Sequence, residues 1–380
     1  MQTAASYTER KYPVNLNFKI MSLSIHQSIA GLALCLAANA SCTTNDHKNN
    51  TIETSALKPV ITTEQVQFDT DDPAIWIHPT DPAKSLVIGT DKDAQGSLYV
   101  FDLAGKIVNK VAGLKRPNNV DIAYGLSLNG TPKDIAVVTE RETNKIRIFS
   151  LPDLQPLDNG GIPVFEGEKE RGPMGIAVYT NKSNHKTYAI VGRKSGPMDQ
   201  YLWQYELKDD GSGKVKATLV RRFGKYSGKK EIEAIAVDNE LGYVYYSDEQ
   251  YGIHKYYADP EKGDTELALF GQADFAEDLE GISIYKTGDS TGYILVSDQQ
   301  ANRFNVYKRE AAQGHPHQHQ LITAIPFSTI ESDGSEVTNI ALNDKFPKGV
   351  FVAMTNGKTF QYYDWRDIQK RIEAQSGQPK

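Results

Sequence analysis

Residues 74–101 read AIWIHPTDPAKSLVIGTDKDAQGSLYVF, and this stretch decides the fold. It contains three short runs rich in β-branched and aromatic residues, at positions 74–77, 86–88 and 98–101. The segments between the runs contain Asp, Pro, Ser and Gly, which favour turns and bound strands. The stretch therefore predicts three consecutive strands with short polar connections.

The same triplet of strands recurs along the whole chain. The leading strands are expected to begin at Ala74, Ile122, Ile176, Ile235, Ile282 and Ile340, 47–59 residues apart. Repeats of this length are typical of propeller blades with insertions, and blades that close in a ring leave few free strand edges. We therefore expect an all-β fold, a six-bladed β-propeller in a single domain, because a β-sandwich or two barrels would not explain six equivalent triplets. A helical period is found only at residues 364–374, which predicts a terminal helix.

The N-terminal segment has the features of an export signal. Residues 29–38, IAGLALCLAA, are too short to cross a bilayer but suit the apolar core of a signal peptide. Ala38-Asn39-Ala40 fits a small-x-small cleavage site, and Met21 is a second start where a signal peptide would begin. We expect residues 1–42 to be an N-terminal extension and signal peptide, residues 43–61 a polar linker, and residues 62–380 the propeller.

Cysteine content and net charge limit the compartment and the partners. The only cysteines are Cys35 and Cys42, so no disulfide can hold the body of the chain together. We expect an exported protein, either secreted, periplasmic or anchored at the outer membrane, with membrane attachment only if Cys42 is lipidated. A net charge of −6 argues against a nucleic-acid partner but leaves a small phosphorylated ligand open. A monomer is expected.

Two positions of the repeat carry polar side chains that a propeller gathers around its central channel. The first position lies two residues before the leading strand and holds Asp72, Glu233 and Glu280 in blades one, four and five. In this alignment Asp72 matches Glu233 and Glu280 better than Asp71 does. Carboxylates of this kind suit Ca²⁺, and the lack of His and Cys at these positions argues against zinc.

The second position follows the second strand of each repeat. It holds Lys92, Arg141 and Lys194 in the first three blades, and Glu249, Gln299 and Asn356 in the last three. A single charged residue in a loop is ordinarily only solvated. The separation of sign around the ring instead favours a polyphosphate ligand, because basic groups bind free phosphate oxygens and cations bridge phosphates to carboxylates.

Five segments together resemble the signature sequences of one enzyme family. These are 71–76 (DDPAIW), 118–122 (NNVDI), 192–194 (GRK), 233–236 (EAIA) and 278–281 (DLEG). In this order they resemble the β-propeller phytases, a family of calcium-dependent 3-phytases, and the resemblance covers residues 62–366. It implies a six-bladed propeller in which several calcium ions support both stability and catalysis.

The resemblance also implies residue roles. The implied calcium ligands are Asp71, Asp72, Asp121, Glu233, Glu249, Asp278 and Glu280, with Glu64 as a further acidic ligand at shorter spacing than in the family. Asp72, Glu233 and Glu280 are the implied catalytic residues. Lys92, Arg141, Lys194 and Asn119 are the implied substrate-binding residues. Met174 stands where the family has a tyrosine, and Thr338, Asn339, Thr355 and Asn356 replace more acidic residues, so a structural calcium in the channel is expected to be weak or absent.

The implied activity is hydrolysis of the phosphate monoesters of phytate (myo-inositol hexakisphosphate), or of its calcium complex, by attack of a calcium-bound water. Two alternatives stay open. One is a calcium-dependent lactonase or esterase on a six-bladed propeller, which needs one central metal and no basic arc. The other is a non-catalytic ligand-binding propeller. Residues 315–319 (HPHQH) are expected to be a solvated loop, and Trp76, Trp203 and Trp365 to be packing residues.

Overall fold

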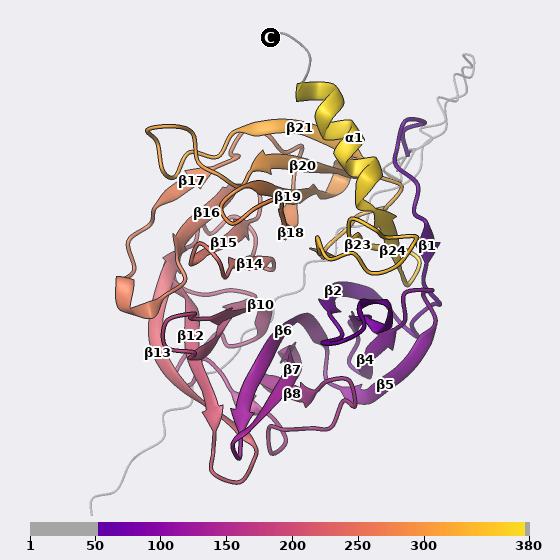
Figure 1. The fold of residues 1–380 in the computed structure, drawn as a ribbon. Coiled ribbons are helices and arrows are strands. Elements are labelled where there is room, and N and C mark those ends of the chain that lie inside the picture. Colours follow the sequence, from indigo (N-terminus) through magenta and orange to yellow (C-terminus); the bar gives the residue numbers. More distant parts are fainter. Residues whose placement is uncertain (1–51, 377–380) are drawn as a thin grey trace, which may run out of the picture. The chain divides into compact units, whose positions relative to one another are not determined.

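Six four-stranded antiparallel sheets stand in a ring around a central axis, as the computed structural model shows for residues 52–376 (Figure 1). The six-bladed, all-β prediction is confirmed. The expected signal peptide, Cys35 and Cys42 lie outside the described residues, as does the linker up to residue 51. Within residues 52–376, no helix is long and apolar enough to span a bilayer.

Each blade runs from an inner leading strand to an outer one. Blade one is β2 (Thr70–Trp76), β3 (Leu86–Asp91), β4 (Gly96–Phe101) and β5 (Ile107–Leu114). Blade two is β6 (Pro117–Leu128), β7 (Thr131–Glu140), β8 (Lys145–Ser150) and β9 (Ile162–Pro163), and blade three is β10 (Pro173–Thr180), β11 (Thr187–Arg193), β12 (Asp199–Asp209) and β13 (Val215–Lys225). Blade four is β14 (Ile235–Asp238), β15 (Tyr243–Asp248), β16 (Gly252–Tyr257) and β17 (Ala268–Phe270), and blade five is β18 (Leu279–Lys286), β19 (Gly292–Asp298), β20 (Arg303–Lys308) and β21 (Leu321–Pro326). Blade six is β22 (Ser335–Val337), β23 (Val350–Thr355), β24 (Thr359–Asp364) and the N-terminal strand β1 (Ile61–Thr62).

The sixth blade closes the ring by joining the two ends of the described chain. Ile61 in β1 pairs with Tyr362 in β24, so the N-terminal strand is the outer edge of the last sheet. The chain packs on the propeller already before residue 62, because the Leu57 N–H donates to the Pro326 carbonyl oxygen at 2.9 Å. This non-covalent closure supplies the outer strand of the sixth sheet from the N-terminal side of the described chain.

The leading strand of the sixth blade is not where the sequence predicted it. Ile340 lies in a bend after the strand and is 41% exposed, whereas β22 pairs Ser335 with Ala353. Leu342 is buried instead against Phe346 in the core between blades six and one. A short apolar run is compatible with a strand or with a loop whose side chains fill a core, and here the loop is formed.

Apolar side chains between successive blades form six separate cores. Alternate residues of each second strand point to opposite faces, so β3 sends Val87 toward blade six and Ile88 toward blade two. The same alternation at Val137 and Val138 fills the cores on both sides of blade two. Trp76, Trp203 and Trp365 are all buried, as expected of packing residues. Each blade is therefore held by two hydrophobic layers, and the leading strands are fixed around the axis.

Helix α1 (Trp365–Ser376) follows the last strand, which confirms the predicted terminal helix. Trp365 stacks on Tyr285 with ring centroids 3.4 Å apart, and Ile368 and Ile372 join the core between blades five and six. The apolar side chains recur at the spacing of one helical face. The helix thus covers the outside of this core, next to β21 and β24 (Figure 1).

The histidine-rich segment 315–319 is only partly the solvated loop that was expected. His315 is exposed, but His319 is 6% exposed. The His319 Nδ1–H donates to the Lys308 carbonyl oxygen at 2.8 Å, because a carbonyl oxygen can only accept. His319 Nε2 lies 3.1 Å from Lys255 Nζ. The expectation was wrong for His319, because an aromatic ring with two polar partners can be buried where composition alone suggests solvent.

Arg309 joins blades five and four through a buried ion pair. Its Nε and Nη2 donate to the two carboxylate oxygens of Asp238 at 2.7 and 2.8 Å, and both side chains are 0% exposed. Arg309→Ala is expected to lower the free energy of unfolding by about 3–5 kcal/mol, because Asp238 would keep a buried, uncompensated charge. Urea unfolding measures the change. Lys370→Ala is the control, because it breaks an exposed ion pair with Asp367 and should lower the free energy of unfolding by less than about 0.5 kcal/mol. Equal losses for the two variants would contradict a special contribution of the buried Arg309–Asp238 pair.

Candidate active site

A belt of polar side chains at the ends of the second strands fixes the loops that lead into the blades. The belt consists of Asp91, Glu140, Arg193, Asp248, Asp298 and Thr355, all buried. Asp91, for example, accepts from the N–H groups of Phe68 and Asp69, and Asp298 accepts from the N–H of Ala276. Each belt residue bonds the loop that enters its own blade. The fold thereby holds these loops, and the acidic side chains that follow them, in defined places.

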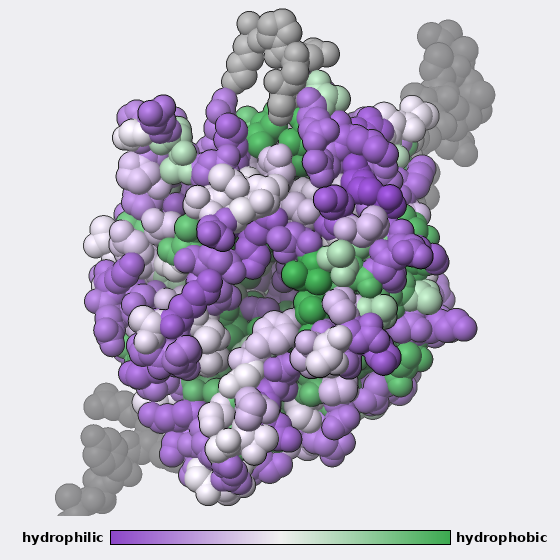
Figure 2. Space-filling model, viewed as in Figure 1, coloured by the Kyte–Doolittle hydropathy of each residue, from purple (hydrophilic) through white to green (hydrophobic). Residues whose placement is uncertain are grey.

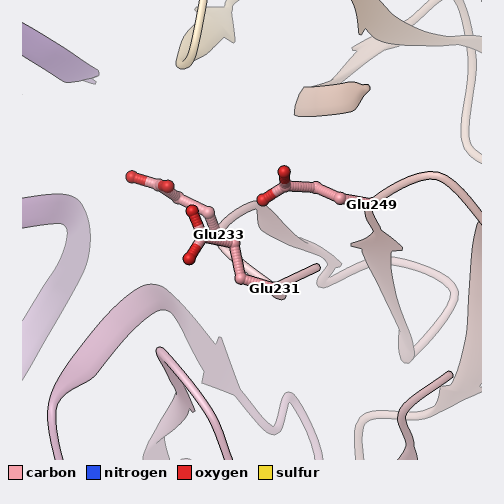
Figure 3. Close-up of side chains that lie close together, drawn as sticks. All are labelled: Glu231, Glu233 and Glu249. Atoms are coloured by element: carbon pink, nitrogen blue, oxygen red, sulfur yellow. The ribbon is translucent and has the colours of Figure 1, made fainter. Parts of the chain in front are cut away.

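Seven carboxylates gather around the mouth of the channel, and we call them the acidic ring. They are Asp71, Glu231, Glu233, Glu249, Asp278, Glu280 and Asp333. Two groups within the ring could hold a metal ion, because in each group one oxygen per residue lies within 4.8 Å of the others. These groups are Glu231, Glu233 and Glu249, and Glu249, Asp278 and Glu280. Figure 3 shows the first group, in which Glu231 and Glu233 come from the segment before β14 and Glu249 from the loop after β15.

Amide side chains link the acidic ring into a closed circuit. On one side the Asn118 amide donates to both Asp71 and Glu233. On the other side Gln300 donates to Asp278 at 2.8 Å and to Gln299 at 2.7 Å, and Gln299 in turn donates to Asp333. Lys92 completes the circuit between Asp333 and Asp71. Carboxylates contributed by blades one, four, five and six therefore form one connected site.

The electrostatics of the acidic ring favour a cation. Burial raises the pKa of Asp71 and of Glu280 well above the usual range, and repulsion from neighbouring carboxylates adds to both shifts. Burial likewise raises the pKa of Glu249 to about 8, although Lys230 opposes the shift. Asp278 differs: burial opposes its ionisation, but hydrogen bonds from Lys230, Gln250 and Gln300 hold its pKa below the usual value. The positive charge on the neighbouring lysines is therefore too small to keep all of the ring carboxylates ionised.

Two carboxylate oxygens supply direct evidence that the donor set fits a metal. Glu249 Oε1 and Glu280 Oε2 are buried and accept no hydrogen bond from the described residues. Buried carboxylate oxygens without donors are costly unless a cation coordinates them. Hard oxygen ligands in a flexible array are those of Ca²⁺. The ring residues therefore fit the ion that the sequence suggested.

The expected alignment of Asp72 with Glu233 and Glu280 is wrong by one residue. In blade five Leu279 pairs with Asp298 and Ile282 with Val296, with a bulge between them. In blade one Thr70 pairs with Asp91 and Pro73 with Gly89, across the same kind of bulge. Pro73, rather than Ala74, therefore occupies the place of Ile282. Asp71 is the structural equivalent of Glu280, and it is Asp71 that joins the ring.

Asp72 belongs to a second acidic group inside the channel. Together with Asp121 and Glu336 it lines a cavity of about 560 Å³, and we call these three residues the channel cluster. Burial raises the pKa of Asp72 well above its usual range, and charges on Glu336 and Asp121 add to the shift. Burial also raises the pKa of Asp121 to about 6 and that of Glu336 to about 8. In Figure 2, hydrophilic side chains predominate around the central hollow of the face in view.

The remaining predicted residues fall in three places. Lys92 contacts Asp71 and lies 3.0 Å from Asp333, Arg141 donates to Asn118, and Lys194 contacts Glu231. These three basic residues therefore stand on the acidic ring in blades one to three, as expected. Asn119 is buried beside them and also lines the channel cavity. Glu64 is not brought near the others, because it is exposed and accepts a hydrogen bond from the Ile107 N–H at the start of β5.

Five residues of these two sites were assigned no role from the sequence. Asp333 and Glu336 were missed because the sixth leading strand was placed at Ile340. The dipeptide Asp333-Gly334 repeats Glu280-Gly281 and could have located the strand. Asn118 and Glu231 lie next to or near assigned residues, but neither was given a role. A fifth residue, Lys230, gave no signal in the repeat, yet its ammonium lies among Glu249, Asp278 and Glu280.

A buried histidine next to the belt predicts a pH dependence of stability. His254 is 1% exposed, and its ring nitrogens contact Asp248 and Glu266. Burial lowers its pKa, but the hydrogen bonds that the ring donates to the two carboxylates outweigh burial, so the pKa lies above the usual value. A histidine with a raised folded-state pKa stabilises the fold fully below its unfolded pKa of about 6.5 and loses this effect as pH rises through the folded value.

His254→Gln is therefore expected to lower the free energy of unfolding by about 1–2 kcal/mol at about pH 6, and by less at about pH 9. Urea unfolding at the two pH values measures the difference. His315→Gln removes an exposed histidine and serves as the control, with no loss expected at either pH. Equal losses for His254→Gln at both pH values would show that its contribution is packing rather than charge.

Comparison with known proteins shows the family of this chain. The family model described as Phytase matches residues 13–365. The chain is 28% identical over 376 residues to the 3-phytase of Bacillus subtilis (strain 168). The alignment covers 93% of this chain and 94% of that protein. A chain in the crystal structure of a nidogen/laminin complex is 13% identical, covers 73% of this chain and 93% of its own length, and has a TM-score of 0.41, too low to carry an argument. The family match spans nearly all of the chain, and this protein is a member of the phytase family.

Proposed function

We propose that this protein hydrolyses the phosphate monoesters of phytate and uses several calcium ions held by the acidic ring. The single observation that carries the proposal is the imbalance of charge in one connected site. Seven carboxylates stand against four basic side chains, Lys92, Arg141, Lys194 and Lys230. Phytate is itself strongly anionic, so it would be repelled from this site unless cations bridge its phosphates to the ring.

Each part of the site would have a different task. When bound, calcium would neutralise crowded phosphates and activate the attacking water. Glu233, Glu249 and Glu280 would hold the ions, and Asp71 and Asp278 would complete the ligand set. Lys92, Arg141 and Lys194 would bind the phosphate oxygens that gain charge in the transition state. Asp72 and Asp121 would hold a further ion in the channel, where it would serve stability rather than turnover.

The basic arc favours a substrate with more than one phosphate. Lys92 and Lys194 belong to blades one and three, on either side of Arg141 in blade two. Phosphates bound along this arc would bring a neighbouring phosphate of the same molecule to the acidic ring. A second phosphate contact of this kind raises affinity without new chemistry, because the second binding event is intramolecular. A monophosphate could make only one of the two contacts.

We also propose that the protein is exported. The support is the apolar segment 29–38 and the cleavage pattern at Ala38–Ala40. Lipidation of Cys42 is the alternative that would anchor the protein to a membrane. Mass spectrometry of the mature N-terminus would separate cleavage after Ala40 from a lipidated Cys42.

The substrate is tested by measuring product from three compounds in calcium-containing buffer. Phosphate release from phytate is expected, with a much lower kcat/KM for a phosphate monoester such as p-nitrophenyl phosphate and no opening of a lactone. Glu233→Gln, which keeps the size of a ring ligand but removes its charge, gives the background of a contaminating phosphatase. Lactone hydrolysis without phosphate release would assign the protein to the alternative enzyme class, and product from none of the three would favour a binding propeller.

A further inference from the structure

A lysine ammonium occupies the space among three carboxylates of the acidic ring. Lys230 Nζ lies 2.6 Å from Glu249 Oε2, 2.7 Å from Asp278 Oδ2 and 3.9 Å from Glu280 Oε1. The same three carboxylates form one of the two groups that could hold a metal ion. An ion in this group and the Lys230 ammonium would therefore compete for the same oxygen atoms.

We infer that Lys230 is an internal counter-cation of this site, and that calcium binds Glu249, Asp278 and Glu280 by displacing the Lys230 ammonium. The inference rests on the proposed function, because calcium is the ion proposed for the ring. It adds a role that neither the repeat nor the basic arc assigns. Three buried carboxylates in contact repel one another, and in the ion-free protein the Lys230 ammonium places positive charge among them.

The surroundings of Lys230 allow an exchange by side-chain movement alone. Its three partners are nearly inaccessible, whereas the Lys230 side chain is 37% exposed. Its backbone is fixed, because the Tyr226 hydroxyl donates to the Lys230 carbonyl oxygen and Asp248 bonds the N–H and the hydroxyl of Ser227. A lysine has a flexible four-carbon stem. The ammonium can therefore leave for solvent while the carboxylates and the loop stay in place.

Displacement would leave Lys230 at the edge of the site, next to the incoming substrate. The fixed backbone keeps the free ammonium within reach of the ring mouth. There it would act as a fourth basic group beside Lys92, Arg141 and Lys194, on the acidic side of the site that otherwise lacks one. The same side chain would thus neutralise the empty site and contribute to phosphate binding once calcium is bound.

The test measures calcium binding to the whole protein by isothermal titration calorimetry with calcium chloride, after removal of metals by chelation. Lys230→Gln is expected to bind calcium roughly ten- to hundredfold more tightly at the affected site. This gain corresponds to the free energy of a hydrogen bond to a charged group, which calcium no longer has to break. Its melting temperature in chelator should fall, and its increase on adding calcium should be larger than that of the wild type. Lys230→Arg keeps the positive charge and should retain wild-type affinity.

Lys229→Gln is the matched control. Lys229 is the adjacent residue and is exposed, and its ammonium donates to the Gln250 carbonyl oxygen at 2.8 Å instead of to a ring carboxylate. The same loss of charge at Lys229 should leave calcium affinity within about twofold of wild type, because a solvent-exposed charge is screened. An equal gain in calcium affinity for both variants would show that only the net charge matters, and it would overturn the proposed displacement of Lys230 by calcium.

The two proposals fail in different ways. Unchanged or weaker calcium binding by Lys230→Gln, with phytate hydrolysis intact in the wild type, would overturn the exchange and leave the proposed function standing. Tighter binding by Lys230→Gln in a protein that releases no phosphate from phytate would support the exchange and overturn the function. A wild type that binds no calcium would overturn both.

Discussion

Removal of calcium is expected to lower phosphate release from phytate by at least about a thousandfold, because metal ions contribute several kcal/mol to stabilising charge in phosphoryl transfer. The acidic ring makes this loss larger than in an enzyme whose own basic residues neutralise the substrate phosphates. Without ions, Asp71, Glu233 and Glu280 would repel the substrate from the place where it must bind. The four basic side chains of the site cannot offset seven carboxylates.

The measurement is an initial rate of phosphate release with calcium titrated from zero in a chelator-buffered solution. Activity should return when calcium is added back, and magnesium should restore less of it, since Mg²⁺ demands a more rigid octahedral site. Full activity in excess chelator would remove metal ions from the mechanism. Unfolding at the assay temperature is checked in parallel by circular dichroism, which separates loss of chemistry from loss of the fold.

The same chelation should also change how stability depends on pH. The pKa of Glu249 is raised to about 8 in the ion-free protein, from a usual value of 4.5. The folded state therefore holds this proton more tightly than the unfolded state does, so the contribution of Glu249 to stability is fully present below about pH 4.5 and is lost as pH rises through about 8. Bound calcium would keep the carboxylate ionised throughout, and the fall should disappear.

The blades could be predicted from the sequence because their inner strands are runs rich in β-branched and aromatic residues. These side chains fill the hydrophobic cores on the two faces of each blade. The sequence did not suffice for the outer strands. β9 has two residues, and β1 pairs with a strand some 300 positions away, so neither has a local pattern. The sixth leading strand was misplaced for a related reason. Ser335-Glu336-Val337 is more polar than Ile340-Ala341-Leu342, yet backbone pairing with β23 selects the polar segment.

The site was predicted as a set of blade positions, and its errors follow from counting along the chain. The first leading strand was counted from Ala74, although Pro73 is the residue that pairs with Gly89 after the bulge. Side chains alternate between the faces of a strand, so an offset of one residue exchanges the ring for the channel. This exchanged Asp71 and Asp72. The basic residues Lys92, Arg141 and Lys194 were unaffected, because each directly follows a belt residue at the end of a regular strand. Lys230 could not be predicted, since its place depends on a loop outside the repeat.

Asp71 and Asp72 therefore provide a matched pair of substitutions, adjacent in sequence and directed to different sites. Asp71→Asn is expected to lower kcat for phytate by about 10²-fold or more, because it removes a carboxylate from the ring where charge develops. Its stability in chelator should change little, since burial already disfavours the ionised form of Asp71. Lys92 would keep its second partner, Asp333, at 3.0 Å.

Asp72→Asn is expected to do the reverse. It removes a carboxylate whose pKa is raised by burial and by the charges on Glu336 and Asp121, so the calcium-free protein should become more stable. The increase in melting temperature on adding calcium should shrink, because the channel loses a ligand, while kcat should stay within about tenfold of wild type. The two variants make the same Asp-to-Asn change at neighbouring positions, so the changes in side-chain volume and charge are equal. A greater loss of kcat for Asp72→Asn than for Asp71→Asn would mean that Asp72 serves the reacting phosphate, and it would restore the alignment that the strand register contradicts.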